Sequence, residues 1–267
     1  MRVAALAAVP PPAAADLLPE LVALADRAGA VILRHYAGGG VAVRAKADAS
    51  PVTAADEAAE AVILEGLARL TPEWPVVAEE AVAAGRVPEV GAGPFWLVDP
   101  LDGTKEFLGR NGEFTVNIAL VRDRAPVLGV VLAPALERAW WGAVGLGAWS
   151  RPAPRAAVRP IRARRRPEGG GVAAVSRSHL DSESVACLER LGVRERVTAG
   201  SSLKFGLIAE GRADVYPRFG RTMEWDTAAG HAVLAAAGGR VVTPADDADL
   251  RYAKPGFENP PFIARGA

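Results

Sequence analysis

The sequence has a single cysteine, Cys187, among 267 residues. One thiol cannot form a disulfide within the chain, and neither a CxxC spacing nor a cluster of cysteine and histidine is present. These absences argue against a disulfide-stapled secreted fold and against a zinc site built from thiolates. We therefore expect a cytoplasmic protein, with peripheral association with the inner membrane left open.

Long apolar runs are also lacking. No stretch approaches the roughly 18 consecutive apolar residues that a membrane-spanning helix needs. The run from Val3 to Val9 is short, rich in alanine and stopped by the prolines at 10–12, which makes it a poor secretion signal. We expect residues 1–15 to be a flexible N-terminal extension and the chain to have no integral membrane segment.

The chain has no excess of either charge. Its 31 basic and 31 acidic residues cancel, so no overall field attracts nucleic acid or an anionic membrane. The segment from Arg151 to Arg166 does hold seven arginines. A surface for nucleic acid would interleave aromatic residues for base stacking, and this segment has none. We predict a solvated loop at the boundary between two parts of the chain, 16–150 and 151–267.

Hydrophobic residues make up 50% of the chain, enough for a large core. Apolar residues recur at helical spacing in residues 16–36, 53–70 and 226–237, and Thr53 and Asp56 have the spacing of a capping box. Strand-like segments within residues 74–149 predict an antiparallel meander in the first part. Alternating strands and helices then predict an α/β second part.

The stretch FWLVDPLDGT places Asp99 and Asp102 directly after four apolar residues. The carboxyl end of a buried strand is where α/β proteins usually bind ligands, and carboxylate oxygens select Mg²⁺, Mn²⁺ or Ca²⁺. Gly103 and Thr104 begin a predicted helix whose free N–H groups suit a phosphate. A plain turn with Asp102 as helix N-cap explains the same residues, and both interpretations stay open at this point.

Three further segments bring acids to the ends of predicted elements. Glu79 and Glu80 follow a strand, Asp226 opens the last helix, and Asp56 lies in the first turn of the second helix. Each has its own structural explanation, as an exposed turn, an N-cap or a capping-box carboxylate. These separate explanations do not account for four segments that all present acids at element ends.

Two long motifs resemble the signatures of a known family. WLVDPLDGTKEF, residues 96–107, resembles the Asp-Pro-Leu/Ile-Asp-Gly-Thr signature of the lithium-sensitive, magnesium-dependent inositol monophosphatase superfamily, and EWDTAAGHAVLAAAGG, residues 224–239, is similar to its second signature. VSRSH and GSSLKFGLIAEGRADVYPRFG resemble the 3′(2′),5′-bisphosphate nucleotidase branch. Lys105 and Glu106 favour this branch, because inositol monophosphatases typically have Thr-Asn there.

The resemblance implies a layered αβαβα sandwich, combining an α+β and an α/β part, and a cofactor of two or three Mg²⁺ ions. The implied metal ligands are Glu79, Asp99, the Leu101 carbonyl, Asp102 and Asp226. The positions that match the water-orienting pair and its support are Asp56, Thr104 and Glu80. The matches to substrate-binding positions are Gly103, Thr104, His179, Ser201, Lys204, Arg218 and Asp226.

The expected reaction is hydrolysis of the 3′-phosphate of 3′-phosphoadenosine 5′-phosphate to AMP and phosphate, as part of sulfur assimilation. A second candidate substrate is 3′-phosphoadenylyl sulfate. An inositol or sugar monophosphate phosphatase shares the metal core and is the main alternative. A non-catalytic nucleotide-binding or metal-binding protein would lack a ligand position, and none is missing. The expected partner is therefore a small phosphorylated nucleotide, with no nucleic acid, and a homodimer is a candidate assembly.

Overall fold

The structure is a computed structural model, and it describes residues 11–38, 43–45, 51–153 and 156–267. The α-helices in these residues are α1 (Pro11–Ala37), α2 (Ala54–Leu70), α3 (Glu79–Ala83), α4 (Thr104–Leu108), α5 (Ser182–Arg190), α6 (Leu203–Ala209) and α7 (Glu224–Ala236). Two short 3₁₀ turns are η1 (Pro134–Leu136) and η2 (Pro255–Phe257). None of these helices is both long and apolar enough to cross a membrane.

The strands form two large sheets and one small hairpin. The seven-stranded sheet has the order β3 (Val76–Ala78), β4 (Phe95–Asp102), β5 (Thr115–Arg122), β6 (Ala125–Ala133), β7 (Arg138–Ala143), β8 (Gly147–Arg151) and β9 (Arg159–Ile161). The five-stranded sheet has the order β11 (Glu195–Ala199), β10 (Val172–Ser176), β12 (Val215–Arg218), β14 (Phe262–Arg265) and β13 (Arg240–Val242). The hairpin pairs β1 (Val43–Ala45) with β2 (Pro51–Thr53).

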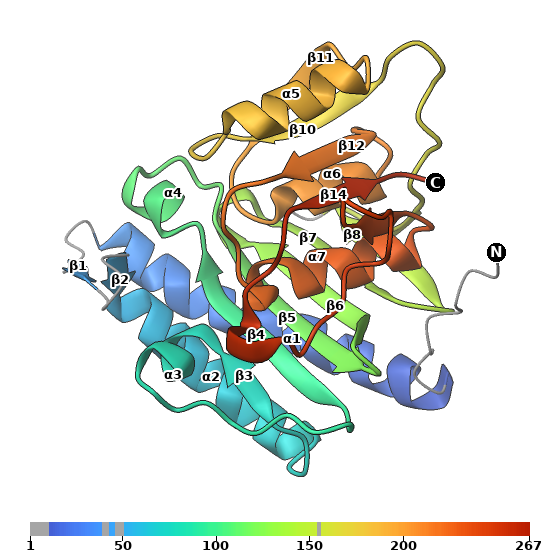
Figure 1. Cartoon of the computed structure of the whole chain (residues 1–267). Coiled ribbons are helices and arrows are strands. Elements are labelled where there is room, and N and C mark those ends of the chain that lie inside the picture. Colours follow the sequence, from blue (N-terminus) through green and yellow to red (C-terminus); the bar gives the residue numbers. More distant parts are fainter. Residues whose placement is uncertain (1–10, 39–42, 46–50, 154–155) are drawn as a thin grey trace.

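The elements stack in five layers (Figure 1). Helices α1 and α2 cover one face of the seven-stranded sheet, and α6 and α7 cover the other. The five-stranded sheet packs on the far side of α6 and α7, and α5 covers its outer face. This arrangement confirms the predicted αβαβα sandwich.

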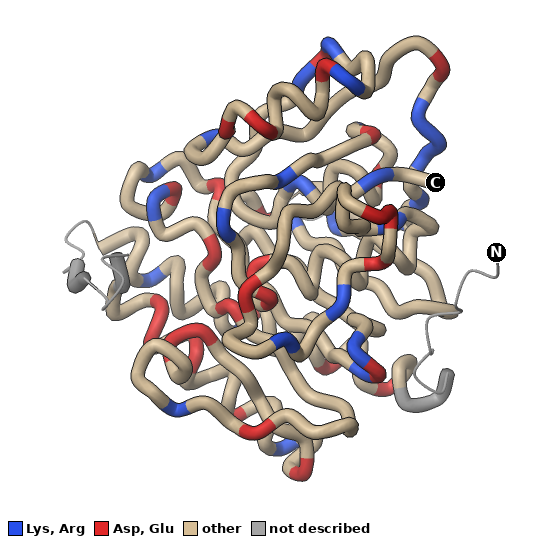
Figure 2. The backbone as a smooth tube through the Cα atoms, viewed as in Figure 1, with Lys and Arg blue, Asp and Glu red and all other residues tan. Residues whose placement is uncertain are grey.

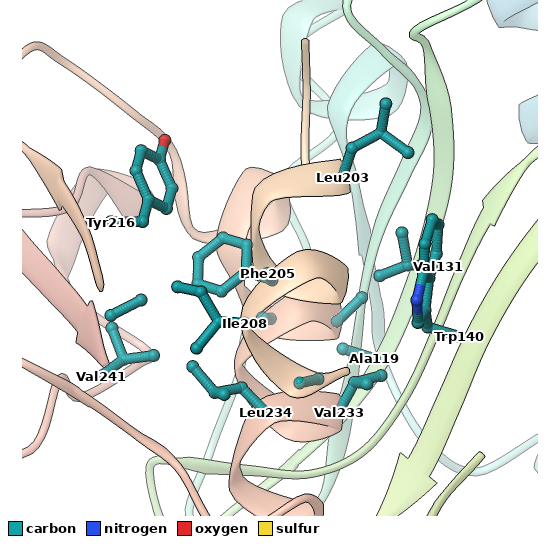
Figure 3. Close-up of a cluster of buried hydrophobic side chains, with 14 of the residues drawn as sticks. Ala119, Val131, Trp140, Leu203, Phe205, Ile208, Tyr216, Val233, Leu234 and Val241 are labelled. Carbon is teal, nitrogen blue, oxygen red and sulfur yellow. The ribbon is translucent and has the colours of Figure 1, made fainter. Parts of the chain in front are cut away.

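The alternation of side chains along the strands separates the cores. On β4, Phe95 and Leu97 point into the core shared with α6 and α7, whereas Trp96 and Val98 point into the core under α1 and α2. Strand neighbours face opposite sides of a sheet, so an unbroken apolar run indicates a strand buried on both faces. Figure 3 shows Phe205 of α6 in the first of these cores, between Tyr216 of the small sheet and Trp140 of the large one.

Helix α7 lies very close to the large sheet. A Cβ atom added at Gly129 of β6 would be 2.5 Å from the Ala229 carbonyl oxygen and 2.9 Å from Ala232 Cβ. Only glycine leaves room for this approach. Because the first turn of α7 carries Asp226, this contact also determines where that carboxylate stands.

Two expectations about the chain change with the structure. Helix α1 begins at Pro11, so residues 11–15 of the expected extension are helical, and residues 1–10 lie outside the described residues. The arginine-rich segment is not only a solvated loop, because Arg159–Ile161 adds β9 to the edge of the large sheet. Other arginines there form ion pairs, such as Arg164 with Asp214 at 2.7 Å, which links two distant segments. Figure 2 shows the basic positions that follow β9.

A buried histidine should make the fold sensitive to acid. His231 of α7 is 3% exposed, and its Nδ1 lies 3.0 Å from the Tyr252 hydroxyl. Burial lowers its pKa to about 3, from an ordinary value of 6.5. A neutral buried histidine stabilises the fold above its unfolded pKa, and this stability is lost as the pH falls toward the folded pKa.

We expect His231 to contribute about 2 kcal/mol to the loss of unfolding free energy between about pH 7.5 and pH 5. The variant His231→Gln removes the titrating ring and keeps a polar group for Tyr252. Urea unfolding of both proteins at the two pH values measures the difference. An equally steep pH dependence in the variant would contradict this assignment.

Candidate active site

The ends of β3 and β4 place the first acids of the site. The two strands are parallel, and their register pairs Ala78 with Val98. Glu79, the first residue after β3, and Asp99 of β4 come directly after this pair and therefore lie at the same sheet edge, where their side chains share a hydrogen bond. Burial, followed by the charges of Glu79 and Asp102, raises the pKa of Asp99 well above its ordinary value.

A β-bulge brings Asp102 to the same edge. The register of β4 with β5 shifts between Asp99 and Asp102, so that Pro100 and Leu101 together stand opposite one residue of β5. Pro100 has no N–H for the ladder, and Leu101 N donates to Asp99 Oδ1 at 3.0 Å. The bulge thus turns two carboxylates of one strand toward a common region.

Glu60 of α2 is a supporting residue that the sequence analysis missed. Its side chain is buried, and Oε2 accepts from Glu80 N at 2.8 Å, with a second bond from the Ala81 backbone. Both N–H groups belong to the first turn of α3, which has no side-chain cap of its own. A charged residue at helical spacing among the apolar positions Ala59 and Ile63 was the available signal.

We expect Glu60→Ala to lower the unfolding free energy by about 1–3 kcal/mol, because two buried N–H groups lose their acceptor. Glu60→Gln keeps an acceptor oxygen and should lose less. Urea denaturation gives the stability change, and Mg²⁺ titration of activity gives the effect on the neighbouring Glu79. An alanine variant as stable as the parent protein would contradict this role.

Asp226 is held by the first turn of α7. The helix begins at Glu224, so Asp226 is its third residue rather than an N-cap, and Oδ2 accepts from Met223 N at 2.8 Å. Burial, followed by the charges of Asp102 and Glu79, raises its pKa well above the ordinary value. The acids of β4, α3 and α7 therefore act on one another across the layers.

Gly103 forms the tight corner between β4 and α4. It occupies the N-cap position with φ of 90°, a left-handed conformation that favours glycine, so Asp102 is not the N-cap. A Cβ there would also lie 3.1 Å from Ser201 Cβ. The corner places Thr104 at the first position of α4 and lets the residue 201 loop approach.

A cavity of about 510 Å³ opens between these acids and the C-terminal layers, a size that suits a small ligand. Nine of the predicted site residues line it, namely Glu79, Asp102, Gly103, Thr104, His179, Ser201, Lys204, Arg218 and Asp226. Unpredicted lining residues include Lys105, Glu106, Tyr216 and Arg221. The cavity thus combines several carboxylates with two lysines and two arginines.

Lys204 is a buried cation in the wall of this cavity. Its Nζ donates to the Ala199 carbonyl at 3.3 Å and to the Ser201 carbonyl, and lies 5.1 Å from the Tyr216 ring centroid. Burial lowers the pKa of Lys204 to about 8, against the attraction of Asp102. Burying an ammonium group is costly, which makes Lys204 a candidate binding residue.

The predicted residues outside the cavity lining have other positions. Asp99 and Leu101 are each 1% exposed and lie within the sheet edge. Asp56 forms the expected capping box, with Oδ2 accepting from Thr53 N at 2.9 Å. Glu80 lies at the start of α3 beside Glu79. A link between Asp56 and Thr104 stays a prediction.

The acidic end of the cavity fits a divalent cation. Burial and the charges of neighbouring carboxylates raise the pKa values of Asp99 and Asp226, and a divalent cation would relieve this mutual repulsion. All the donors are oxygens, which suit Mg²⁺ or Mn²⁺. Among the described residues, no group of three or more histidine, cysteine, aspartate or glutamate side chains lies close enough together to hold a metal ion.

The comparison with family models agrees with this fold. Residues 14–261 match the model described as the inositol monophosphatase family. The chain therefore belongs to the inositol monophosphatase family, whose members are generally metal-dependent phosphatases.

Curated relatives and solved structures show which members of this family the chain is similar to. The 3′(2′),5′-bisphosphate nucleotidase CysQ of Salmonella typhimurium is 50% identical over 226 residues, which cover 84% of this chain and 89% of the relative. CysQ of Escherichia coli K12 is 49% identical over the same shares. The crystal structure of CysQ from Bacteroides thetaiotaomicron has a TM-score of 0.77 at 36% identity, covering 92% of this chain and 96% of that one. An inositol monophosphatase from Anabaena has a TM-score of 0.74 at 28% identity, with 94% and 90% covered.

Proposed function

We propose that this protein hydrolyses the 3′-phosphate of 3′-phosphoadenosine 5′-phosphate with the help of Mg²⁺, and that 3′-phosphoadenylyl sulfate is a second substrate. That it is a phosphoric monoester hydrolase follows from its family and from identities of 49–50% to CysQ nucleotidases. The observation that carries the finer proposal is the presence of acids and cations in one cavity. In a ligand with two phosphates, one phosphate can be bound at the acids through metal ions and the other at the cations.

The acidic end would hold the phosphate that is cleaved. Glu79, Asp99, the Leu101 carbonyl, Asp102 and Asp226 are the residues that would bind two or three Mg²⁺ ions. When bound, such ions act as Lewis acids toward water and phosphate oxygens. Thr104 stands beside these acids, and its hydroxyl would orient the attacking water, with Asp56 holding the hydroxyl proton and Glu80 supporting the same region.

The cationic end would hold the second phosphate and the nucleoside. Lys204 offers a buried point charge and Arg218 a planar fork of donors, both suited to phosphate oxygens. The Arg218 Nε is buried and has no hydrogen-bond partner among the described residues. His179 and the Ser201 hydroxyl complete the polar groups of this wall.

A substrate panel on the purified protein tests the proposal. We expect kcat/KM for the bisphosphate nucleotide to exceed that for inositol 1-phosphate by about 100-fold, because only the nucleotide meets the cationic end. Chelation of divalent ions should abolish both activities, and millimolar lithium should inhibit, as is typical of the family. Faster hydrolysis of inositol 1-phosphate would refute the proposed substrate and favour the alternative.

A further inference from the structure

Two side chains of α4 reach the turn that follows β10. Lys105 Nζ lies 3.0 Å from His179 Nε2, and the Ser178 hydroxyl donates to Glu106 Oε1 at 2.6 Å. The contacts join residues 74 and 72 positions apart in the sequence, from the first part of the chain to the second. Neither contact involves the groups assigned to hydrolysis.

Glu106 is built into its place rather than exposed to solvent. Glu106 is only 4% exposed, and so little exposure is rare for a glutamate unless its carboxylate has partners. A Cβ at Gly103 would lie 3.2 Å from Glu106 Oε2, and a Cβ at Gly200 would lie 2.7 Å from Glu106 Cγ. Two glycines from distant segments of the chain therefore leave room for this one side chain, which gives Ser178 a fixed acceptor.

The contact with Lys105 determines the protonation state of His179. A lysine ammonium group has donors only, so His179 Nε2 must accept, and a neutral ring then carries its proton on Nδ1. Partial burial, followed by the positive charges of Lys105 and Arg218, lowers the pKa of His179, consistent with the neutral ring. Arg218 also donates to the His179 carbonyl at 2.9 Å, which fixes the backbone of the turn.

We propose that Lys105 and Glu106 are specificity-determining positioning residues that clamp the Ser178–His179 turn onto the cationic end of the cavity. The clamp presents one fixed donor, His179 Nδ1–H, to an acceptor atom of the nucleotide. This inference rests on the proposed function. The hydrogen bonds of the clamp go to Ser178 and His179, so their loss should weaken binding of the nucleotide far more than hydrolysis of the phosphate ester.

Kinetics of clamp variants test the proposal against a small ester. We expect Ser178→Ala and Lys105→Met each to raise KM for the bisphosphate nucleotide about tenfold, the effect of losing one hydrogen bond to a charged group, with kcat within about twofold. Activity on p-nitrophenyl phosphate, which has no nucleoside, should stay within about twofold. Ser178→Thr keeps the hydroxyl and should restore KM.

The matched control is Ser182→Ala, an exposed serine at the start of α5. It should leave KM at the wild-type value. An unchanged KM in Ser178→Ala and Lys105→Met would overturn the clamp. Equal losses on the nucleotide and on p-nitrophenyl phosphate would overturn it too, because they would indicate general damage to the site.

A second readout does not depend on activity. The chain has three histidines, so ¹⁵N NMR of their rings can be assigned with single variants. We expect His179 to be the neutral Nδ1–H tautomer and Lys105→Met to shift it toward Nε2–H. A wild-type His179 in the Nε2–H form would overturn the clamp. If the wild type does not hydrolyse the nucleotide, the proposed function fails, while the NMR result still decides whether the clamp exists.

Discussion

Asp102→Asn is expected to lower kcat on the bisphosphate nucleotide by about 1,000-fold or more, equivalent to about 4 kcal/mol of transition-state stabilisation. Asp102 ends β4 at the bulge and lines the cavity with Glu79 and Asp226. The amide keeps the shape of the side chain and removes the negative charge that would bind a divalent ion. Steady-state kinetics at saturating Mg²⁺ measures the effect.

The same variant should keep its fold. Burial, together with Glu79 and Glu106, raises the pKa of Asp102 to about 6, against the opposing charge of Lys204. A neutral amide removes this unfavourable buried charge, so the metal-free variant should melt no lower than the parent protein. The stabilisation that Mg²⁺ gives the parent should be reduced. Asp16→Asn, on the exposed surface of α1, is the control. An active Asp102→Asn enzyme would contradict the metal-binding role.

Lys204→Met is expected to raise KM for the bisphosphate nucleotide by about 100-fold, equivalent to about 3 kcal/mol. Methionine replaces the lysine stem over Tyr216 and removes only the ammonium group. The proposed partner of the lost charge is the second phosphate, so the same substitution should change KM for adenosine 3′-monophosphate far less.

The comparison of these two nucleotides is the control built into that experiment. They share the base, the ribose and the 3′-phosphate, and differ only in the 5′-phosphate. Circular dichroism and thermal melting check that the variant is folded. An equal rise of KM for both would show that Lys204 acts on the shared part of the ligand and would remove it from the second phosphate site.

Several features of the fold could be predicted because their signal is local. The helical spacing in residues 53–70 and the Thr53–Asp56 box predicted α2 and its start, and the structure confirms both. The apolar run before Asp99 predicted a buried strand. The short strands β9, β11, β13 and β14 were missed. They have little periodicity of their own and owe their conformation to the partner strands beside them.

The site residues likewise divide into those that the sequence predicted and those that only the tertiary structure revealed. Motif resemblance pointed to Glu79, Asp102 and Asp226, and the structure brings all three to one cavity. It did not point to Glu60, whose role is a pair of hydrogen bonds to the backbone of another element. Asp226 was expected to be the first residue of the last helix. In the structure that helix begins two residues earlier, at Glu224, because Glu224 and Trp225 are buried in the core.

The amino-acid sequence by itself determined the elements that carry the acids, the membership in a phosphatase family and the pair Lys105–Glu106 in place of Thr-Asn. Only the tertiary structure decided that these two residues meet Ser178 and His179, and that the acids share a cavity with Lys204. The physical reason is distance along the chain. Contacts between residues 70 or more positions apart depend on how layers pack, and no local periodicity or spacing encodes them.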